Sequence, residues 1–456
     1  MRLDDVFLYL DGHFEEAIGD VVRLCRQPSI SAQNVGMEET AKLVAAMLEE
    51  AGAKARLMPL PGGGPPVVYG ELAGNSPTTL MLYNHYDVQP PEPLELWSSP
   101  PFEPTREGDI LRARGVSDDK GDIAARLAAI KAFRAVRGSL PVSLKFCIEG
   151  AEEIGSPHLM EFAEKNKSLL KADCCIWEGG DVNWKGQPVI ILGVKGILYV
   201  QLEAQSASRD VHSSKGATVP NAAWRLVWAL ASLKDSEENI LIPGFRDTIR
   251  PLSPAELGAA RDMPSEEEEL KQSLGVKRFV RDVHGVDFRM RHLFEPTCTI
   301  CGLVSGYTGP GAKTVLPSIA KAKIDFRLVP DQRPDDILAK LRSHLDKNGF
   351  QDIKIAQSVE GENPARTPLD SPFVSLVGDA ARDVYKMEPV VVPTSAGTGP
   401  MFAFTDVLGL PVASSGVSYP DSRVHAPDEN MRLSDFDKAI KHMAAIIERL
   451  GRQPGV

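Results

Sequence analysis

The sequence predicts an α/β protein whose mostly parallel central sheet belongs to a domain interrupted by an inserted α+β domain. Helical and strand-like patterns alternate from residue 1 to about residue 197. After Gly196 the sequence pattern changes to strict alternation of apolar and polar residues. The alternation of helical and strand-like segments resumes after about residue 364. We therefore expect one domain built from 1–197 and 365–456, with 198–364 as the inserted domain.

The first segment contains helices and short apolar strands in turn. Met37–Gly52 and Asp119–Arg137 have helical periodicity, whereas Thr78–Tyr83, Val142–Glu149 and Asp173–Trp177 are apolar runs of strand length. Helices that alternate with fully apolar strands are typical of a parallel sheet covered on both faces.

The inserted segment has a different pattern. Apolar and polar residues alternate over 198–204 and again over 321–328, which indicates a sheet with one buried and one open face. A long polar stretch, 235–295, separates the two runs. Within it the acidic run Glu266–Glu269 follows Ser265, and we interpret this as the first turn of a capped helix.

The final segment resumes the first pattern. Gly361–Leu369 is expected to be a linker, Ser371–Lys386 a helix and Pro411–Ser415 a short strand. A last amphipathic helix is expected to start at Ser434 and to end at Gly451.

Composition narrows the classes of function. The 456 residues are more than one hydrophobic core usually serves, and the net charge of 51 − 62 = −11 argues against nucleic-acid binding. No run of about 18 apolar residues is present, so we expect no membrane span. The acidic start of the chain is unlike a signal peptide. We expect a cytoplasmic protein.

The six cysteines do not form a recognisable framework. Cys298 and Cys301 make a single C-x-x-C, and zinc would need a second pair at matching spacing. We expect all six to be buried or idle thiols in a reducing cytoplasm.

Polar side chains follow the predicted strands at the edge where α/β sheets place their sites. Two of them are imidazoles and the others are carboxylates. They are His85 and Asp87 after Thr78–Tyr83, Glu152 and Glu153 after Val142–Glu149, Glu178 after Asp173–Trp177, Asp118 and Asp119 at a helix start, and His425 late in the chain.

This donor set predicts a metal centre. Histidine together with carboxylate suits zinc, manganese or cobalt better than magnesium or calcium. These residues come from five places in the chain, and one ligand from each would make five, which is too many for one catalytic zinc ion that takes about three. The set fits two ions that share one bridging carboxylate and a bridging water.

Four motifs in this order, NHYDVQP, GVSDDKG, EEIGS and HAPDEN, resemble the two-zinc metallopeptidase family of carnosine dipeptidases, carboxypeptidase G and the aminoacylases. The resemblance covers nearly the whole chain and is greatest to the dipeptidase branch. It implies a zinc-peptidase-like catalytic domain with an inserted lid and dimerisation domain. It also implies two divalent metal ions per chain, with zinc expected first and manganese or cobalt as alternatives.

The resemblance implies roles for the first two motifs. His85 would be a terminal ligand of the first metal, and Asp87 would hydrogen-bond and orient it. Asp118 would bridge the two metals. Asp119 would shape the turn, and family members often have a cis peptide bond between these two positions.

The resemblance also explains why two glutamates stand side by side. Glu153 would be a ligand of the second metal, and Glu152 would be the general base. His425 would complete the shell of the second metal. Glu178 would complete that of the first, with Asp181 as a rival; we favour Glu178 because it directly follows a strand.

The inserted domain would contribute substrate contacts. His212 matches the lid histidine that reaches the partner subunit's active site, although an isolated histidine is more often structural. Thr314 and Arg327 match substrate-binding positions, and Arg327 could clamp a terminal carboxylate or form only a surface salt bridge. Thr398 lies in a glycine-rich turn, Thr394–Pro400, where carnosinase-like members carry an arginine and a serine.

The resulting expectation is a homodimeric peptidase that acts on small peptides. A metal-bridged water would attack the amide bond of dipeptides or short peptides, with Glu152 as general base. The alternatives are an N-acyl amino acid deacylase or carbamoylase with the same metal ligands, and a non-catalytic metal-binding scaffold. The scaffold is disfavoured because Glu152 is present although it binds no metal in this scheme.

Overall fold

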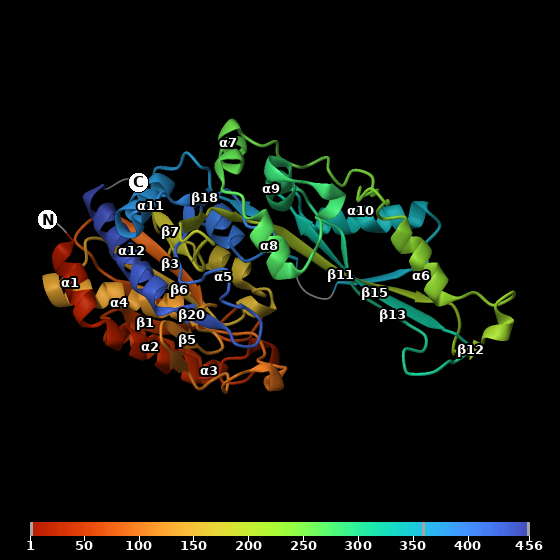
Figure 1. Ribbon diagram of the computed structural model, residues 1–456, viewed down its shortest axis with the longest axis horizontal. Coiled ribbons are helices and arrows are strands. Elements are labelled where there is room, and N and C mark those ends of the chain that lie inside the picture. Colours follow the sequence, from red (N-terminus) through yellow and green to blue (C-terminus); the bar gives the residue numbers. More distant parts are fainter. Residues whose placement is uncertain (1–2, 358–360, 454–456) are drawn as a thin grey trace.

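The computed structural model describes residues 3–357 and 361–453. Figure 1 shows two lobes, with both termini on the lobe that holds the central sheet. That sheet has six strands in the order β1-β2-β6-β3-β7-β19. β6, β3, β7 and β19 are mutually parallel, whereas β1 and β2 pair antiparallel at one edge. The strands are β1 (Lys54–Met58), β2 (Val67–Leu72), β3 (Thr79–His85), β6 (Ser143–Glu149), β7 (Cys174–Trp177) and β19 (Val412–Ser414).

Both faces of this sheet are covered, as the apolar strand sequences predict. Leu80 and Leu82 of β3 belong to one core cluster, while Met81 and Tyr83 belong to another on the opposite face. The first cluster includes residues of six helices, which are α1 (Asp4–Gly12), α2 (Phe14–Arg26), α3 (Met37–Glu50), α4 (Lys120–Arg137), α11 (Pro372–Tyr385) and α12 (Leu433–Arg452). The second includes α5 (Leu159–Lys165) and the π-helical turn Ala403–Val407.

The second lobe is formed by the inserted segment. Its sheet has the order β13-β15-β11-β16, all antiparallel, with its own core cluster beneath α6 (Ala222–Ala231) and α10 (Pro334–Lys347). Leu198 and Val200 of β11 point into this cluster, as the alternation predicts. The strands are β11 (Gly196–Gln205), β13 (Thr299–Ser305), β15 (Ile319–Leu328) and β16 (Lys354–Gln357). The boundaries 198 and 364 stay our proposed limits of this domain.

The polar stretch 235–295 contains helices α7 (Pro254–Asp262), α8 (Glu267–Leu274) and α9 (Gly285–Phe294). The acidic run predicted α8, whereas α7 and α9 were not expected from the sequence. Leu293 and Phe294 of α9 pack with Val390 and Val392, so this part of the insertion contacts the first lobe. The contacted strands form a small sheet of β8 (Asp181–Val182), β9 (Pro188–Ile191) and β18 (Val390–Val392).

Short strands complete the fold. They are β4 (Thr105–Glu107), β5 (Ile110–Arg112) and β20 (Asn430–Arg432) in one sheet, β10 (Gly193–Val194) with β17 (Ala365–Arg366), and β12 (Val211–His212) with β14 (Val315–Leu316).

Some helix ends differ from the predictions. The last helix begins at Leu433 and runs through Gly451 to Arg452, and the hydroxyl of Ser434 donates to Asp109 Oδ2 (2.6 Å) instead of capping the helix. The acidic run does begin a helix, but Ser265 bonds the Glu267 carboxylate and no side chain caps that end.

Within the described part of the chain, no helix is both long enough and apolar enough to cross a membrane. All six cysteines are free thiols. Five are buried, as expected, whereas Cys301 of the C-x-x-C pair is exposed.

Candidate metal centre

The ends of three neighbouring parallel strands place the predicted donors at one edge of the central sheet. β3 ends at His85, which lies opposite Glu149 at the end of β6. β6 leads into the short 3₁₀ turn Glu152–Ile154, and β7 leads directly to Glu178. Because the strands are parallel, their carboxyl ends bring these side chains together.

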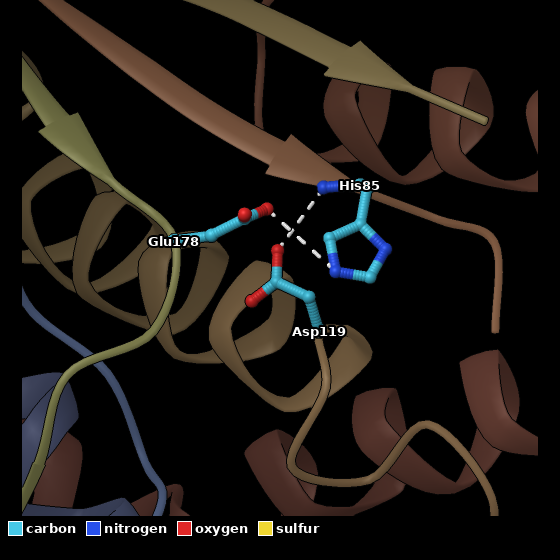
Figure 2. A group of neighbouring side chains, drawn as sticks. All are labelled: His85, Asp119 and Glu178. Atoms are coloured by element: carbon cyan, nitrogen blue, oxygen red, sulfur yellow. Dashed lines mark hydrogen bonds and ion pairs between the residues drawn. The ribbon is translucent and has the colours of Figure 1, made fainter. Parts of the chain in front are cut away.

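One group of donors surrounds His85. Its Nε2 lies 3.0 Å from Asp118 Oδ1 and 3.6 Å from Glu178 Oε2. This Glu178 oxygen is buried and has no hydrogen-bond partner among the described residues. Figure 2 shows the Glu178 carboxylate and the His85 ring facing each other from the ends of their strands.

A second group surrounds His425. Its Nε2 lies 3.0 Å from Asp118 Oδ2 and 3.1 Å from Glu153 Oε2. The two oxygens of Asp118 therefore face different histidines, one in each group. This is the arrangement that a carboxylate bridging two ions requires.

The distances fit a metal centre. Donors about 2.1 Å from a tetrahedral ion lie about 3.4 Å from one another. The measured nitrogen–oxygen separations of 3.0–3.6 Å are close to this value. A buried Glu178 oxygen without a hydrogen-bond partner also fits a cation that this carboxylate would contact.

Asp119 lies within 4.8 Å of His85 and Glu178 and is a geometric alternative to Asp118. However, its Oδ2 already accepts hydrogen bonds from the Asn84 amide (2.6 Å) and the His85 backbone N–H (3.1 Å), the second of which is drawn in Figure 2. These bonds hold the turn against β3. The peptide bond between Asp118 and Asp119 is cis, as the resemblance implies.

Asp87 is fully buried and connects the first histidine to the glutamate pair. Its two carboxylate oxygens accept hydrogen bonds from the backbone N–H groups of Glu152 (3.2 Å) and Glu153 (3.0 Å). Its Oδ1 lies 3.4 Å from His85 Nδ1, while its backbone carbonyl is closer, at 3.0 Å. The carboxylate thus fixes the glutamate turn, and the carbonyl is the nearer partner of the imidazole.

Glu152 and Glu153 diverge from adjacent positions. Glu153 faces His425 and is also held by Gln89, whose side chain donates to Oε2 (2.8 Å). Glu152 belongs to neither donor group. Its Oε1 lies beside Gly399, where a Cβ atom would come within 3.5 Å of it.

Several carboxylates lie close together around two histidines in this centre, and burial and their mutual interactions shift their pKa values. Burial raises the pKa of Glu152 well above its usual value, and the nearby His85 opposes this. Hydrogen bonds that His425 donates to the carboxylates of Asp118 and Glu153 raise its pKa to about 10. Burial alone would raise the pKa of Asp118, but the two histidines lower it strongly. Divalent cations would relieve this concentration of negative charge.

Three residues that support the donor groups were not identified from the sequence: Gln89, Arg126 and Glu429. Glu429 accepts hydrogen bonds from the backbone N–H groups of Ser117 (2.9 Å) and Asp118 (3.2 Å), and Arg126 donates to backbone carbonyls at the ends of β3 and β7. Gln89 and Glu429 lie inside the NHYDVQP and HAPDEN motifs, which could have drawn attention to them. Arg126 is a charged residue among apolar neighbours of a buried helix, and this is also a usable signal.

The predicted substrate residues fall into two separate places. Arg327 of β15 donates from Nη1 to Thr398 Oγ1 (2.6 Å), and its Nε lies 3.2 Å from Asp325 Oδ2. The neighbouring Gly399 adjoins Glu152 and Glu178. Arg327 and Thr398 are therefore brought together at the side of the donor groups.

His212 and Thr314 are brought together elsewhere. The His212 Nε2 lies 3.2 Å from Thr314 Oγ1, and both side chains are exposed. They belong to β12 and the segment before β14, at the end of the inserted lobe that is farthest from the central sheet in Figure 1. Asp181, the rival of Glu178, lies in neither donor group and lines a cavity instead.

Comparisons with known proteins show relatives that match over nearly the whole chain. The human Beta-Ala-His dipeptidase is 29% identical over 97% of this chain and 92% of its own length. The Cys-Gly metallodipeptidase dug1 of Schizosaccharomyces pombe is 28% identical over 99% of this chain and 98% of its own length. A crystal structure of the metallo-carboxypeptidase Sso-CP2 from Sulfolobus solfataricus superposes with a TM-score of 0.91, at 40% identity, over 96% of this chain and 100% of that one.

The profile of one family also matches residues 81–449, a range that starts within β3 and includes both histidine groups, the inserted lobe and most of the last helix. A match of this extent, together with relatives aligned over nearly their whole length, identifies the family of this chain. The chain belongs to peptidase family M20/M25/M40.

Proposed function

We propose that this protein is a two-metal peptidase that hydrolyses the amide bond of dipeptides or short peptides. The observation that carries the proposal is the position of Asp118, with one carboxylate oxygen on each histidine. Two full-length relatives with dipeptidase names support the choice of substrate.

The proposed ligands are those of the two donor groups. His85, Glu178 and Asp118 would hold the first ion, and Glu153, His425 and Asp118 the second. Mixed imidazole and carboxylate donors favour zinc, with manganese and cobalt as alternatives. When bound, the ions would polarise the scissile carbonyl and lower the pKa of the attacking water.

Glu152 would act as general base. It adjoins both groups without belonging to either, so its carboxylate is available to accept a proton from the attacking water. The same carboxylate would then deliver that proton to the leaving nitrogen. Asp87 would keep Glu152 in position through the two backbone hydrogen bonds that it accepts in the glutamate turn.

Arg327 and Thr398 would bind the carboxylate end of the substrate. The guanidinium already contacts the threonine hydroxyl, and the turn that holds Thr398 adjoins Glu152 and Glu178 at Gly399. A substrate carboxylate would accept charge-assisted hydrogen bonds from this pair.

A second copy of the chain would complete the active site. His212 and Thr314 lie far from the metal centre of their own chain, so their proposed contact with substrate requires a partner subunit. The inserted lobe has apolar side chains that are more than half exposed, and β13 is an edge strand. These exposed residues are Trp224, Trp228, Ile300, Leu303 and Val304. Both features favour a homodimer.

A second candidate activity is release of a carboxy-terminal residue from peptides whose amino end is blocked. The observation in its favour is the 40% identity to a protein described as a metallo-carboxypeptidase. Deacylation of N-acyl amino acids would use the same metal ligands. The cytoplasmic location is also part of the proposal, and the six free thiols of the described chain support it.

The deciding experiment is a substrate panel for the metal-reconstituted protein. Dipeptides, tripeptides, N-acetyl dipeptides and N-acyl amino acids would be compared by kcat/KM. We expect free dipeptides to be the best substrates. Faster cleavage of the N-acetylated peptides would favour the carboxypeptidase, and faster cleavage of N-acyl amino acids would favour the deacylase. No hydrolysis of any class would contradict a peptidase.

A further inference from the structure

A cavity of about 310 Å³ lies between the small β8-β9-β18 sheet and helices α8 and α9. Its walls are mainly apolar and come from both lobes. Ile191, Val390 and Val392 form the sheet side, and Leu270 and Phe288 form the helix side. A partly open, mainly apolar cavity of this size can accommodate a long side chain of a ligand.

The cavity borders two of the segments that form the metal centre. Asp181, on its wall, follows the proposed ligand Glu178 by three residues. Ser395 and Ala396 also line it and begin the turn that continues to Gly399. A Cβ atom at Gly399 would lie 3.5 Å from Glu152 and 3.8 Å from Glu178, so the same turn reaches the reacting groups.

The cavity wall includes an acidic group, Asp181, one of whose oxygens has no hydrogen-bond partner among the described residues. The Oδ1 atom of Asp181 is inaccessible to solvent and has no hydrogen-bond partner among the described residues, although the side chain as a whole is only half-buried. Burial, together with the Glu266 carboxylate, raises the pKa of Asp181 to about 7. The ionised form is therefore poorly stabilised in the free protein, and a cation in the cavity would stabilise it.

The other charged side chains on the cavity wall already form hydrogen bonds with the protein, some more than others. Glu266 accepts one hydrogen bond, from the Trp184 backbone N–H (3.2 Å), and Glu267 is held by the Gly285 N–H (2.7 Å) and by His284. The Arg289 guanidinium donates to the carbonyls that end α7, which directs two of its nitrogens to that helix. Asp181 and Glu266 are thus the acids that are free to take a new partner.

We propose that this cavity is a specificity subsite that receives a basic side chain, lysine or arginine, of the peptide substrate. The methylene stem would lie along the apolar walls, and the cationic end would pair with Asp181 and Glu266. A buried charge is tolerated when an opposite charge meets it, and this pairing would satisfy both partners. The inference rests on the proposed peptidase function, because it assigns the cavity to the substrate of that reaction.

Kinetics with matched peptides test the subsite. Lys-Ala and Ala-Lys would be compared with Nle-Ala and Ala-Nle, which have a neutral side chain of similar length. We expect kcat/KM to favour lysine at one of the two positions. Asp181→Asn should reduce that preference about 10- to 100-fold, which is the usual range for losing a charged hydrogen bond. Glu266→Gln should reduce it less, since this carboxylate already has a partner.

The matched control is Glu268→Gln. Glu268 lies on the same helix as the cavity wall, but it is exposed, pairs with Lys271 and does not line the cavity. This variant removes the same charge and should leave the lysine preference within twofold of wild type. A wild-type enzyme without lysine preference at either position would overturn the proposal, as would an Asp181→Asn variant with unchanged preference.

A binding measurement separates this proposal from the proposed function. Butylguanidinium stays protonated and does not coordinate metals, and butylurea is its neutral counterpart. We expect calorimetry to detect binding of the guanidinium to wild type, about tenfold weaker binding to Asp181→Asn, and no binding of the urea. If this pattern holds in a protein that cleaves no peptide, the subsite stands and the proposed function fails. Equal binding of both compounds would overturn the subsite.

Discussion

Removing the Asp87 carboxylate is expected to damage the protein more than most single substitutions. Asp87 is fully buried and accepts hydrogen bonds from the N–H groups of Glu152 (3.2 Å) and Glu153 (3.0 Å). Asp87→Ala would leave both donors without a partner in a buried turn. At about 1–3 kcal/mol for each unsatisfied group, the metal-loaded variant should lose about 2–6 kcal/mol of stability. Turnover should fall as well, because the turn positions Glu152.

Urea denaturation of the metal-saturated protein measures the loss, provided that the transition is reversible. The matched control is Asp109→Ala. Asp109 also accepts two hydrogen bonds, from the N–H and the hydroxyl of Ser434, but it is exposed, so water can replace it. We expect the control to lose about 1 kcal/mol or less. Equal losses in the two variants, or an Asp87→Ala variant with wild-type stability and turnover, would refute the reasoning.

Three further predictions concern the partner subunit, the metal and the substrate. Mixing inactive His212→Ala and Glu152→Ala proteins under subunit exchange should restore about half of wild-type activity per mixed dimer, since one site would receive both intact residues; no recovery despite proven exchange would mean that His212 does not act across the dimer. The pKa of His425 is raised from 6.5 to about 10, so a proton competes with the metal across this window; zinc affinity, measured by chelator competition, should therefore increase from pH 6.5 to 8.5, and a flat profile would contradict this. Arg327→Met should raise KM for dipeptides roughly 10- to 150-fold by removing a charged hydrogen bond, whereas an unchanged KM would exclude a carboxylate clamp.

Most of the fold could be predicted because its local signals agree with its tertiary environment. β7 and the centre of β3, Leu80–Tyr83, are apolar and are buried on both faces, and β11 alternates because only one of its faces meets a core. Of the helices in 235–295, α7 and α9 were missed for a physical reason. They are short and partly polar, so their sequences carry little periodicity.

The candidate metal centre was predictable at the level of residue types and strand ends. The sequence placed His85 and Glu178 after parallel strands, and the structure brings them within 3.6 Å. Residue types and strand ends alone did not distinguish the roles of adjacent acids, which came only from the family resemblance. Asp118 and Asp119 differ because one faces two histidines, whereas the other accepts hydrogen bonds from Asn84 and a backbone amide.

Supporting contacts across the fold were the least predictable part. Glu429 accepts a hydrogen bond from the N–H of Asp118, which is 311 residues away in the sequence, and no local pattern encodes such a pair. The contact of Arg327 with Thr398 likewise joins the two lobes across 71 residues. Asp181 was considered only as a metal ligand, and its place in a cavity depends in part on helix α9, which the sequence did not reveal.

The central claim is that two ions lie between His85 and His425 while Glu152 acts without binding either. Elemental analysis of purified Glu152→Ala and wild type, combined with turnover of a dipeptide, tests this directly. We predict two ions per chain in both proteins and a loss of about 10²- to 10⁴-fold in kcat for the variant. A single tightly bound ion in a fully active wild type, or a variant with kcat within threefold of wild type, would contradict the account.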